Sequence, residues 1–328
     1  MEWRMKGSST HSPFAPPDPV FDRKFVLTGM ILLMLAITVF TYLHYLQPHI
    51  LRVPSNTDVS AWKNPTFDQT CIYDRMTESE RERVRSQGIP LNDMPNIMLA
   101  VIFSLVCSWL CFAHARRHYG SWMAWCFLFG SFVFTGMQES MWILFGRFVG
   151  RSAMSGLAND PSYGTYWFTK GGLWFIETPV EVCLGWFFLA YGCVWIAAKV
   201  FPGTRLLGRA AVGGLIAMTM DLWEDPVATS PELMSWVWAK GDFLRVLGIP
   251  HTNFLGWFSL IFLFAIFWEW LPAMERRWGR LRATLAFFSI VVVAEVAILI
   301  FMFIECTIIQ HLMALGGFTQ GVQIPKGW

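Results

Sequence analysis

The sequence predicts an all-α integral membrane protein, a polytopic helical bundle with about seven transmembrane helices. Three observations support this fold class. Of the 328 residues, 55% are hydrophobic and only 15% are charged, far below the roughly 25% of charged residues in soluble domains. The mean hydropathy is +0.43. The apolar residues are gathered in runs of about 20, the length of helix that crosses a hydrocarbon layer about 30 Å thick. A soluble enzyme, a disordered chain and a secreted disulfide scaffold are therefore excluded.

The chain begins with a polar N-terminal tail, residues 1–24, followed by the first expected transmembrane helix, residues 25–46. This apolar run is too long for the core of a signal peptide and has no small-residue cleavage site, so we expect it to remain as a membrane span. A long polar loop follows at residues 47–96. The helical membrane core is expected at residues 97–310, and a C-terminal tail at residues 311–328.

Six apolar segments divide the membrane core. They cover residues 97–113, 122–145, 179–198, 207–222, 254–271 and 283–309. Lys and Arg counts in the short loops favour the side that carries the N-terminus, so the positive-inside rule predicts a cytoplasmic N-terminus and an external C-terminus. No internal repeat is evident. One helical bundle is the simplest architecture, because backbone exposed to lipid must satisfy its own hydrogen bonds.

Charge and cysteine usage exclude several partners. The net charge is +2, so no nucleic-acid partner is expected. The seven cysteines are an odd number without a CxxC pair, and no disulfide framework is expected. Glycine-rich phosphate loops are absent, and the seven histidines are too few for a membrane di-iron site. We therefore expect neither a di-iron centre nor a phosphate-binding loop, and the favoured hypothesis below needs no cofactor and no bound metal.

Carboxylates within the apolar runs are the main candidates for chemistry, because charged groups are costly inside a membrane. They are Glu139, Glu181, Asp221, Glu295 and Glu305. In the predicted topology four of them, from four helices, share one membrane half, and Glu295 lies mid-span. Each also has a structural interpretation. Glu181 can close a capping box with Thr178, with Pro179 as the first helical residue, and Glu139 can pair with another helix.

The densest acidic cluster is Asp221-Leu222-Trp223-Glu224-Asp225-Pro226. Asp221, Glu224 and Asp225 can share one helix face and bind a divalent cation or hold a proton. The alternative is a helix end at which the acids meet water, because Pro226 disfavours helical geometry at the preceding residue.

Polar and aromatic residues near the expected outer loops are further candidates. Asn253 is expected to be the N-cap of the sixth span, and His251 an interfacial polar residue. Most of the 18 tryptophans are expected to form a belt at the membrane interface. Some can instead line a flat apolar pocket and stabilise a cation through their ring faces.

Several spaced motifs resemble, in the same order, the carotenoid biosynthesis family that includes the CruF-type carotenoid 1,2-hydratases. The likeness covers about residues 130–272 and rests on Gly164–Thr169, Thr178–Glu181, Gly185–Tyr191, Asp221–Pro226, Trp236–Trp238, Gly248–Pro250 and Asn253–Trp257. It implies a multi-span enzyme, a carotenoid 1,2-hydratase-like lyase, that adds water across the terminal double bond of a linear carotenoid end without a redox cofactor. The implied partners are a carotenoid or another long apolar isoprenoid, the lipid bilayer and other carotenoid enzymes.

The same resemblance points to catalytic and binding residues. Alkene hydration needs a general acid, a dry pocket that shelters the tertiary cation, and a base that directs one water. A carboxyl group kept away from water can stay protonated near neutral pH and be that acid. We expect Asp221 or Asp225 to donate the proton, and Glu139 or Glu181 to hold the water. The expected substrate contacts are Tyr166, Trp186, Trp223, Trp238, His251, Asn253 and Trp257.

Two other functions remain open. The spacing Asp221-x-x-Glu224-Asp225 also resembles the acidic motif with which intramembrane prenyltransferases hold magnesium and a diphosphate. Only Lys240, Asp242 and Arg245 are available to complete such a site, and magnesium dependence would separate the two enzymes. The second alternative is a proton-coupled transporter, in which intramembrane carboxylates act as relays. The missing repeat and the gathering of the acids in one membrane half argue against transport.

Overall fold

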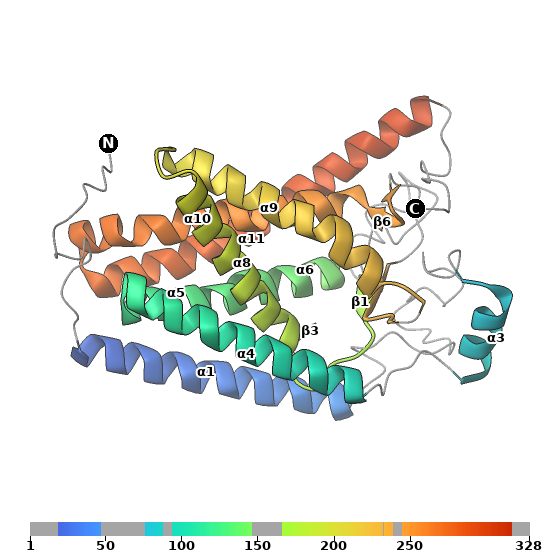
Figure 1. Ribbon diagram of the computed structural model, residues 1–328, viewed down its shortest axis with the longest axis horizontal. Coiled ribbons are helices and arrows are strands. Elements are labelled where there is room, and N and C mark those ends of the chain that lie inside the picture. Colours follow the sequence, from blue (N-terminus) through green and yellow to red (C-terminus); the bar gives the residue numbers. More distant parts are fainter. Residues whose placement is uncertain are drawn as a thin grey trace.

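The computed structural model describes residues 19–46, 76–87, 94–145, 166–231, 233–238 and 245–316. Its long helices form one bundle, with three two-stranded sheets near one end (Figure 1). We call this end the strand end. The prediction of an all-α membrane bundle is confirmed. The predicted tail up to residue 18 and most of the loop 47–96 lie outside the described residues.

The first helices carry mostly apolar, exposed side chains. Helix α1 (Pro19–Leu46) begins before the predicted residue 25, and α4 (Met94–Tyr119) forms the second span. Leu35 on α1 and Trp109 on α4 are 58% and 69% exposed, as expected for helices that face lipid tails. Between them in the chain, the charged helix α3 (Glu78–Gln87) lies beyond the strand end (Figure 1).

The third predicted span, residues 122–145, is a helix with a π-helical turn in its middle. It consists of α5 (Ser121–Ser131), η3 (Phe132–Gly136) and α6 (Met137–Phe145). The backbone stays right-handed helical at both junctions. Six other described helices are long and apolar enough to cross a membrane. The α5–η3–α6 helix covers the third predicted span, and its crossing of the membrane stays a prediction. Single π turns are frequent at functional sites, and this one ends shortly before Glu139.

The remaining spans are α8 (Val180–Val200), α9 (Leu206–Ala228), α10 (His251–Trp278) and α11 (Arg280–Leu315). Helix α9 continues through Pro226 to Ala228, so the helix end expected at Asp225 is wrong. Helix α11 extends to Leu315, so part of the predicted C-terminal tail is helical. Edge-to-face rings of Phe127, Phe264 and Trp268 form the centre of the apolar core.

Two segments of the chain contain the same kinds of elements in the same order, which contradicts the expectation that there is no internal repeat. The first unit contains α6, β1 (Tyr166–Phe168), the hairpin of β2 (Trp174–Phe175) and β3 (Thr178–Pro179), and α8. The second unit contains α9, β4 (Trp236–Trp238), the hairpin of β5 (Arg245–Val246) and β6 (Ile249–Pro250), and α10. In both units the second helix begins directly after the hairpin.

The two hairpins match in detail. The first turn residue has a positive φ in each, 57° at Ile176 and 53° at Leu247, although side chains with a Cβ rarely adopt this conformation. Each hairpin ends on a proline that is the N-cap of the next helix, with φ −58° and ψ 140° at Pro179 and φ −57° and ψ 134° at Pro250. The tetrapeptide Leu-Gly-Trp-Phe then follows in both helices, ending at Phe187 and at Phe258.

The pairing of β1 with β4 joins the two units through equivalent strands. These strands are antiparallel, with Tyr166 opposite Trp238, Trp167 opposite Val237 and Phe168 opposite Trp236. If the two units are exchanged, the pair Tyr166–Trp238 takes the place of the pair Phe168–Trp236, and the middle pair stays in place. This is the pattern of a self-complementary two-fold contact. Both α8 and α10 begin at the strand end, so the two units run in the same direction, as in parallel repeats of other membrane proteins.

Candidate functional site

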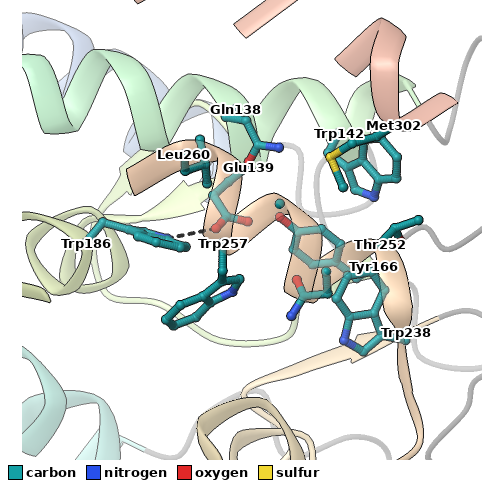
Figure 2. A pocket seen from close by; sticks show the side chains of 12 residues that line it. Gln138, Glu139, Trp142, Tyr166, Trp186, Trp238, Thr252, Trp257, Leu260 and Met302 are labelled. Carbon is teal, nitrogen blue, oxygen red and sulfur yellow. Dashed lines mark hydrogen bonds between the residues drawn. The ribbon is translucent and has the colours of Figure 1, made fainter. Parts of the chain in front are cut away.

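A pocket lies between the two units near the strand end. About 320 Å³ of space there is not filled by protein atoms, and part of this space is open to the surroundings of the protein. Its wall contains five aromatic side chains and only a few polar ones, the usual composition of a small-molecule site. The lining residues are Gln138, Glu139, Trp142, Tyr166, Trp186, Trp238, Thr252, Asn253, Gly256, Trp257, Leu260 and Met302 (Figure 2).

Glu139 is the carboxylate of the pocket wall. It is 9% exposed, and its Oε1 accepts a hydrogen bond of 2.8 Å from the indole N–H of Trp186 (dashed line in Figure 2). The ring of Trp186 contacts that of Trp257, with centroids 4.3 Å apart. These tryptophans occupy equivalent positions in the two units. The pair therefore forms a contact between the two units, next to the carboxylate.

The β2–β3 hairpin fastens the helical turn that carries Glu139. The Ser140 hydroxyl donates to the carbonyl of Gly136 at 2.7 Å and accepts from the backbone N–H of Glu177 at 3.0 Å. The Thr178 hydroxyl donates to the same carbonyl at 3.1 Å. Thr178 thus bonds the neighbouring helix, and the capping box predicted for Glu181 is not formed, since the N-cap of α8 is Pro179 without a side-chain bond.

Helix α1 holds the other side of this hairpin. The fully buried His44 ring stacks on Trp174, with centroids 4.1 Å apart, and its Nε2–H donates to the carbonyl of Ile176 at 2.8 Å. The backbone N–H of Trp174 donates to the Thr41 hydroxyl at 2.9 Å. Ile176 is the hairpin residue with positive φ, so the contact with His44 stabilises the unfavourable turn.

Asp221 and Asp225 lie directly behind the pocket wall. They are 0% and 2% exposed, which contradicts the interpretation that acids at this place meet water. The Asn253 amide donates to Asp221 Oδ2 at 2.8 Å, and the indole N–H of Trp238 donates to Asp225 Oδ2 at 3.3 Å. Trp236 also donates to Asp225 Oδ2, at 3.4 Å. Each aspartate therefore holds a residue of the pocket wall.

The acids of the two units form one electrostatic cluster. Asp221, Glu224 and Asp225 lie on the first helix of the second unit, and all three are near enough to act on Glu139, which lies on the first helix of the first unit. Glu295 on α11 is also near enough to interact electrostatically with Glu139. It is fully buried, and neither of its carboxyl oxygens has a hydrogen-bond partner in the described part of the chain.

The family model for carotenoid biosynthesis proteins matches residues 96–319. The chain belongs to this family. No curated protein and no solved structure matches it. The match extends beyond the region 130–272 on which the resemblance was based, and it contains both units, the whole pocket wall and the acidic cluster. Helices α1 and α3 of this carotenoid biosynthesis protein precede the match.

Most of the expected site residues gather at the pocket. Its wall contains Glu139, Tyr166, Trp186, Trp238, Asn253 and Trp257. Asn253 is not the N-cap of α10 as expected, because that helix begins at His251 with Pro250 as its N-cap. Asn253 is free to bond Asp221 because it lies inside the helix, on the face toward α9.

Three expected site residues lie elsewhere in this carotenoid biosynthesis protein. Trp223 is 72% exposed on the surface of α9. His251 Nε2 is 2.8 Å from Glu305 Oε1 and joins the start of α10 to α11. Glu181, in the first turn of α8, lies beside the backbone of Gly172 and not in the pocket wall. Of the residues considered for a diphosphate site, Lys240 and Asp242 lie outside the described residues.

Six wall residues were not expected from the sequence: Gln138, Trp142, Thr252, Gly256, Leu260 and Met302. The repeated Leu-Gly-Trp-Phe would have indicated Gly256, since it precedes one of the two equivalent tryptophans. Leu260 and Met302 carry no such signal, because apolar residues occur throughout these helices. The expectation that most tryptophans form a belt at the membrane interface is also wrong for the buried ones, such as Trp174, which is 1% exposed.

Proposed function

We propose that this carotenoid biosynthesis protein is a hydratase that adds water to the terminal 1,2 double bond of a linear carotenoid end. The observation that carries the proposal is the position of Glu139. It is the carboxylate in the wall of a pocket that is otherwise mostly aromatic. A proton donor beside apolar ring faces is the combination that protonation of an alkene requires.

The reaction balances without a redox partner. Glu139 gives its proton to C2 of the terminal double bond, forming a C–H bond and leaving a tertiary cation at C1. The oxygen of one water then bonds to C1, and the proton that this water loses returns to the Glu139 carboxylate. The net change is the addition of one water, which gives a tertiary alcohol and restores the acid.

The rings of Trp186 and Trp257 keep water away from the cation and stabilise its charge. The faces of Trp186 and Trp257 stabilise a positive charge by about 0.5–2 kcal/mol per favourable ring contact. The Trp186 N–H, bonded to Glu139, fixes the carboxyl group relative to these rings. In this proposal one end of a long isoprenoid enters the pocket, and the remainder of the chain extends into the lipid.

Asp221 and Asp225 act as positioning residues in this mechanism. Both were expected to be proton donors, but neither lies in the pocket wall, and direct proton transfer needs contact with the reacting carbon. Through Asn253 and Trp238 they fix the wall opposite Glu139.

Pigment analysis tests the proposal. The chain is expressed in a host that accumulates lycopene, and the pigments are analysed by liquid chromatography and mass spectrometry. We expect a new, more polar pigment that is heavier by one water. Glu139→Gln keeps the size of the side chain but removes the acid, so it abolishes this pigment. The matched control Glu181→Gln, outside the pocket wall, retains it. Unchanged pigment from wild-type protein verified in the membrane would contradict the proposal.

The same experiment separates the two alternatives. A prenyl-transferring enzyme requires magnesium and a diphosphate substrate, and its product is heavier by a prenyl group. A proton-coupled transporter moves protons without a new pigment. The duplicated unit removes one argument against transport, because parallel repeats also occur in transporters. Membership of the carotenoid biosynthesis family favours the enzyme.

A further inference from the structure

A group of basic side chains lies at the end of the bundle opposite the strand end, where α4 and α8 both finish (Figure 1). We call this group the basic cluster. Its members are Arg116, Arg117 and His118 on α4 and Lys199 on α8, and all four residues are exposed. The net charge of the chain is only +2, so the basic cluster is a local excess that the overall charge does not reveal.

The basic cluster surrounds one indole ring, that of Trp195 on α8. The Lys199 Nζ lies 4.5 Å from the centre of this ring, and the centre of the His118 ring lies 4.8 Å from it. The ring of His114 contacts the same indole, with centroids 4.4 Å apart, and a hydrogen bond of 2.6 Å joins its Nδ1 to the Tyr191 hydroxyl. Basic groups from two helices are therefore held at one place.

The surroundings of the basic cluster are electropositive. The groups that act electrostatically on His114 are His118, Lys199 and Arg117, all of them basic. Among the residues that the structure describes, no carboxylate forms an ion pair with a member of the cluster. The cluster thus presents positive charge at its surface without an acidic side chain to balance it.

Other arginines near the same end of the bundle do have acidic partners. Arg209 forms an ion pair with Glu269, and Arg280 forms ion pairs with Asp22 and Glu275. The dipoles of the two helix C-termini favour nearby cations, but they do not require cations from both helices to gather at one ring. The missing acidic partner therefore indicates an anion that comes from outside the chain.

Apolar side chains that face the lipid flank the basic cluster. Ile196 and Val200 on α8 are 47% and 61% exposed, and Leu110 on α4 is 62% exposed. Long basic side chains near helix ends reach the polar surface of a membrane while their stems cover apolar surface. Charge at the surface above an apolar face matches a phospholipid, which has a phosphate in the headgroup and acyl chains beneath it.

We propose that the basic cluster binds the phosphate of an anionic phospholipid, whose acyl chains lie along the exposed apolar faces of α4 and α8. Lys199 and Arg117 supply the positive charge, and His118 supplies a hydrogen-bond donor beside them. Basic sites between transmembrane helices bind anionic lipid headgroups in this way. The inference is independent of the proposed hydratase function, because the pocket lies near the other end of the bundle.

Lipid titration of the purified full-length protein tests the inference. Delipidated protein in detergent is titrated with phosphatidylglycerol or with phosphatidylcholine, and bound lipid is measured by native mass spectrometry. We expect phosphatidylglycerol to bind more tightly and to raise the thermal midpoint further. Lys199→Gln and Arg117→Gln each remove one charge from an exposed position, so each lowers the affinity for phosphatidylglycerol about 5-fold.

Arg277→Gln is the matched control. Arg277 lies 5.9 Å from the centre of the Trp278 ring, at the end of α10 on the same side of the bundle but outside the basic cluster. This variant retains the wild-type affinity. An equal loss in Arg277→Gln and Lys199→Gln would overturn the inference, since lipid would then respond only to total charge. Equal affinity of the wild-type protein for the two lipids would also overturn it.

Inorganic phosphate separates a lipid from a free anion. At the same concentration as phosphatidylglycerol, it should leave the thermal midpoint unchanged, because it has no acyl chains to contact α4 and α8. A rise equal to that produced by the lipid would assign the cluster to a free phosphate ion and overturn the lipid proposal. Pigment hydration is not part of this measurement, so its outcome leaves the hydratase proposal unaffected.

Discussion

The hydroxyl groups of Ser140 and Thr178 lie 3.0 Å apart and join the helix that carries Glu139 to the hairpin that precedes α8. Both hydroxyls converge on the carbonyl of Gly136, where the π-helical turn ends. The position of the pocket carboxylate is therefore determined by a segment distant from it in sequence, and this relationship leads to the first prediction.

Ser140→Ala removes the hydroxyl that donates to Gly136 and accepts from the backbone N–H of Glu177. Loss of these two buried hydrogen bonds costs about 1–3 kcal/mol, so we expect a lower thermal midpoint in detergent and reduced pigment hydration. Thr219→Ala is the matched control, because its hydroxyl bonds a carbonyl of its own helix on an exposed face. Equal midpoints of the two variants would show that the contact with the hairpin contributes no stability.

Gly136→Ala tests how closely the hairpin approaches this helix. A Cβ at Gly136 would lie 2.7 Å from a ring carbon of Phe175 and 3.0 Å from the sulfur of Cys183. Overpacking of this kind costs about 1–3 kcal/mol, and we expect loss of stability together with loss of activity. Gly185→Ala is the control, since no atom lies within 4 Å of its added Cβ and alanine favours a helix by about 1 kcal/mol. Thermal unfolding of both variants measures the difference.

His44→Ala tests whether α1 contributes to the site. The substitution removes the bond to Ile176 and the stack on Trp174, so we expect destabilisation of about 1–3 kcal/mol and a slower hydration reaction. His44→Phe restores the stack alone and should recover part of the loss. Wild-type activity and stability in both variants would mean that the matched family region, residues 96–319, holds the hairpin without α1.

The sequence predicted the spans well because each is long and apolar, and an apolar run of this length indicates a membrane span without any knowledge of tertiary contacts. It also predicted roles for Glu139, which lines the pocket, and for the aspartates behind the wall, since intramembrane carboxylates are costly and therefore rare. It could not distinguish Trp223 from Trp257, because a tryptophan facing lipid and one facing a pocket are equally apolar. The repeat was missed because only short motifs persist, and the hairpins match in backbone conformation more than in sequence.

The last prediction separates positioning from proton donation. Asp221→Asn and Asp225→Asn keep a side-chain oxygen that accepts from Asn253 or Trp238 but lose its charge. A charge-assisted hydrogen bond contributes about 1.5–3 kcal/mol, so each variant should lower hydration about 10- to 100-fold, whereas Glu139→Gln abolishes it. Hydration rates at saturating lycopene, normalised to membrane protein, give the comparison. Complete loss in a stably folded Asp225→Asn, together with residual turnover in Glu139→Gln, would transfer the role of acid to the aspartate.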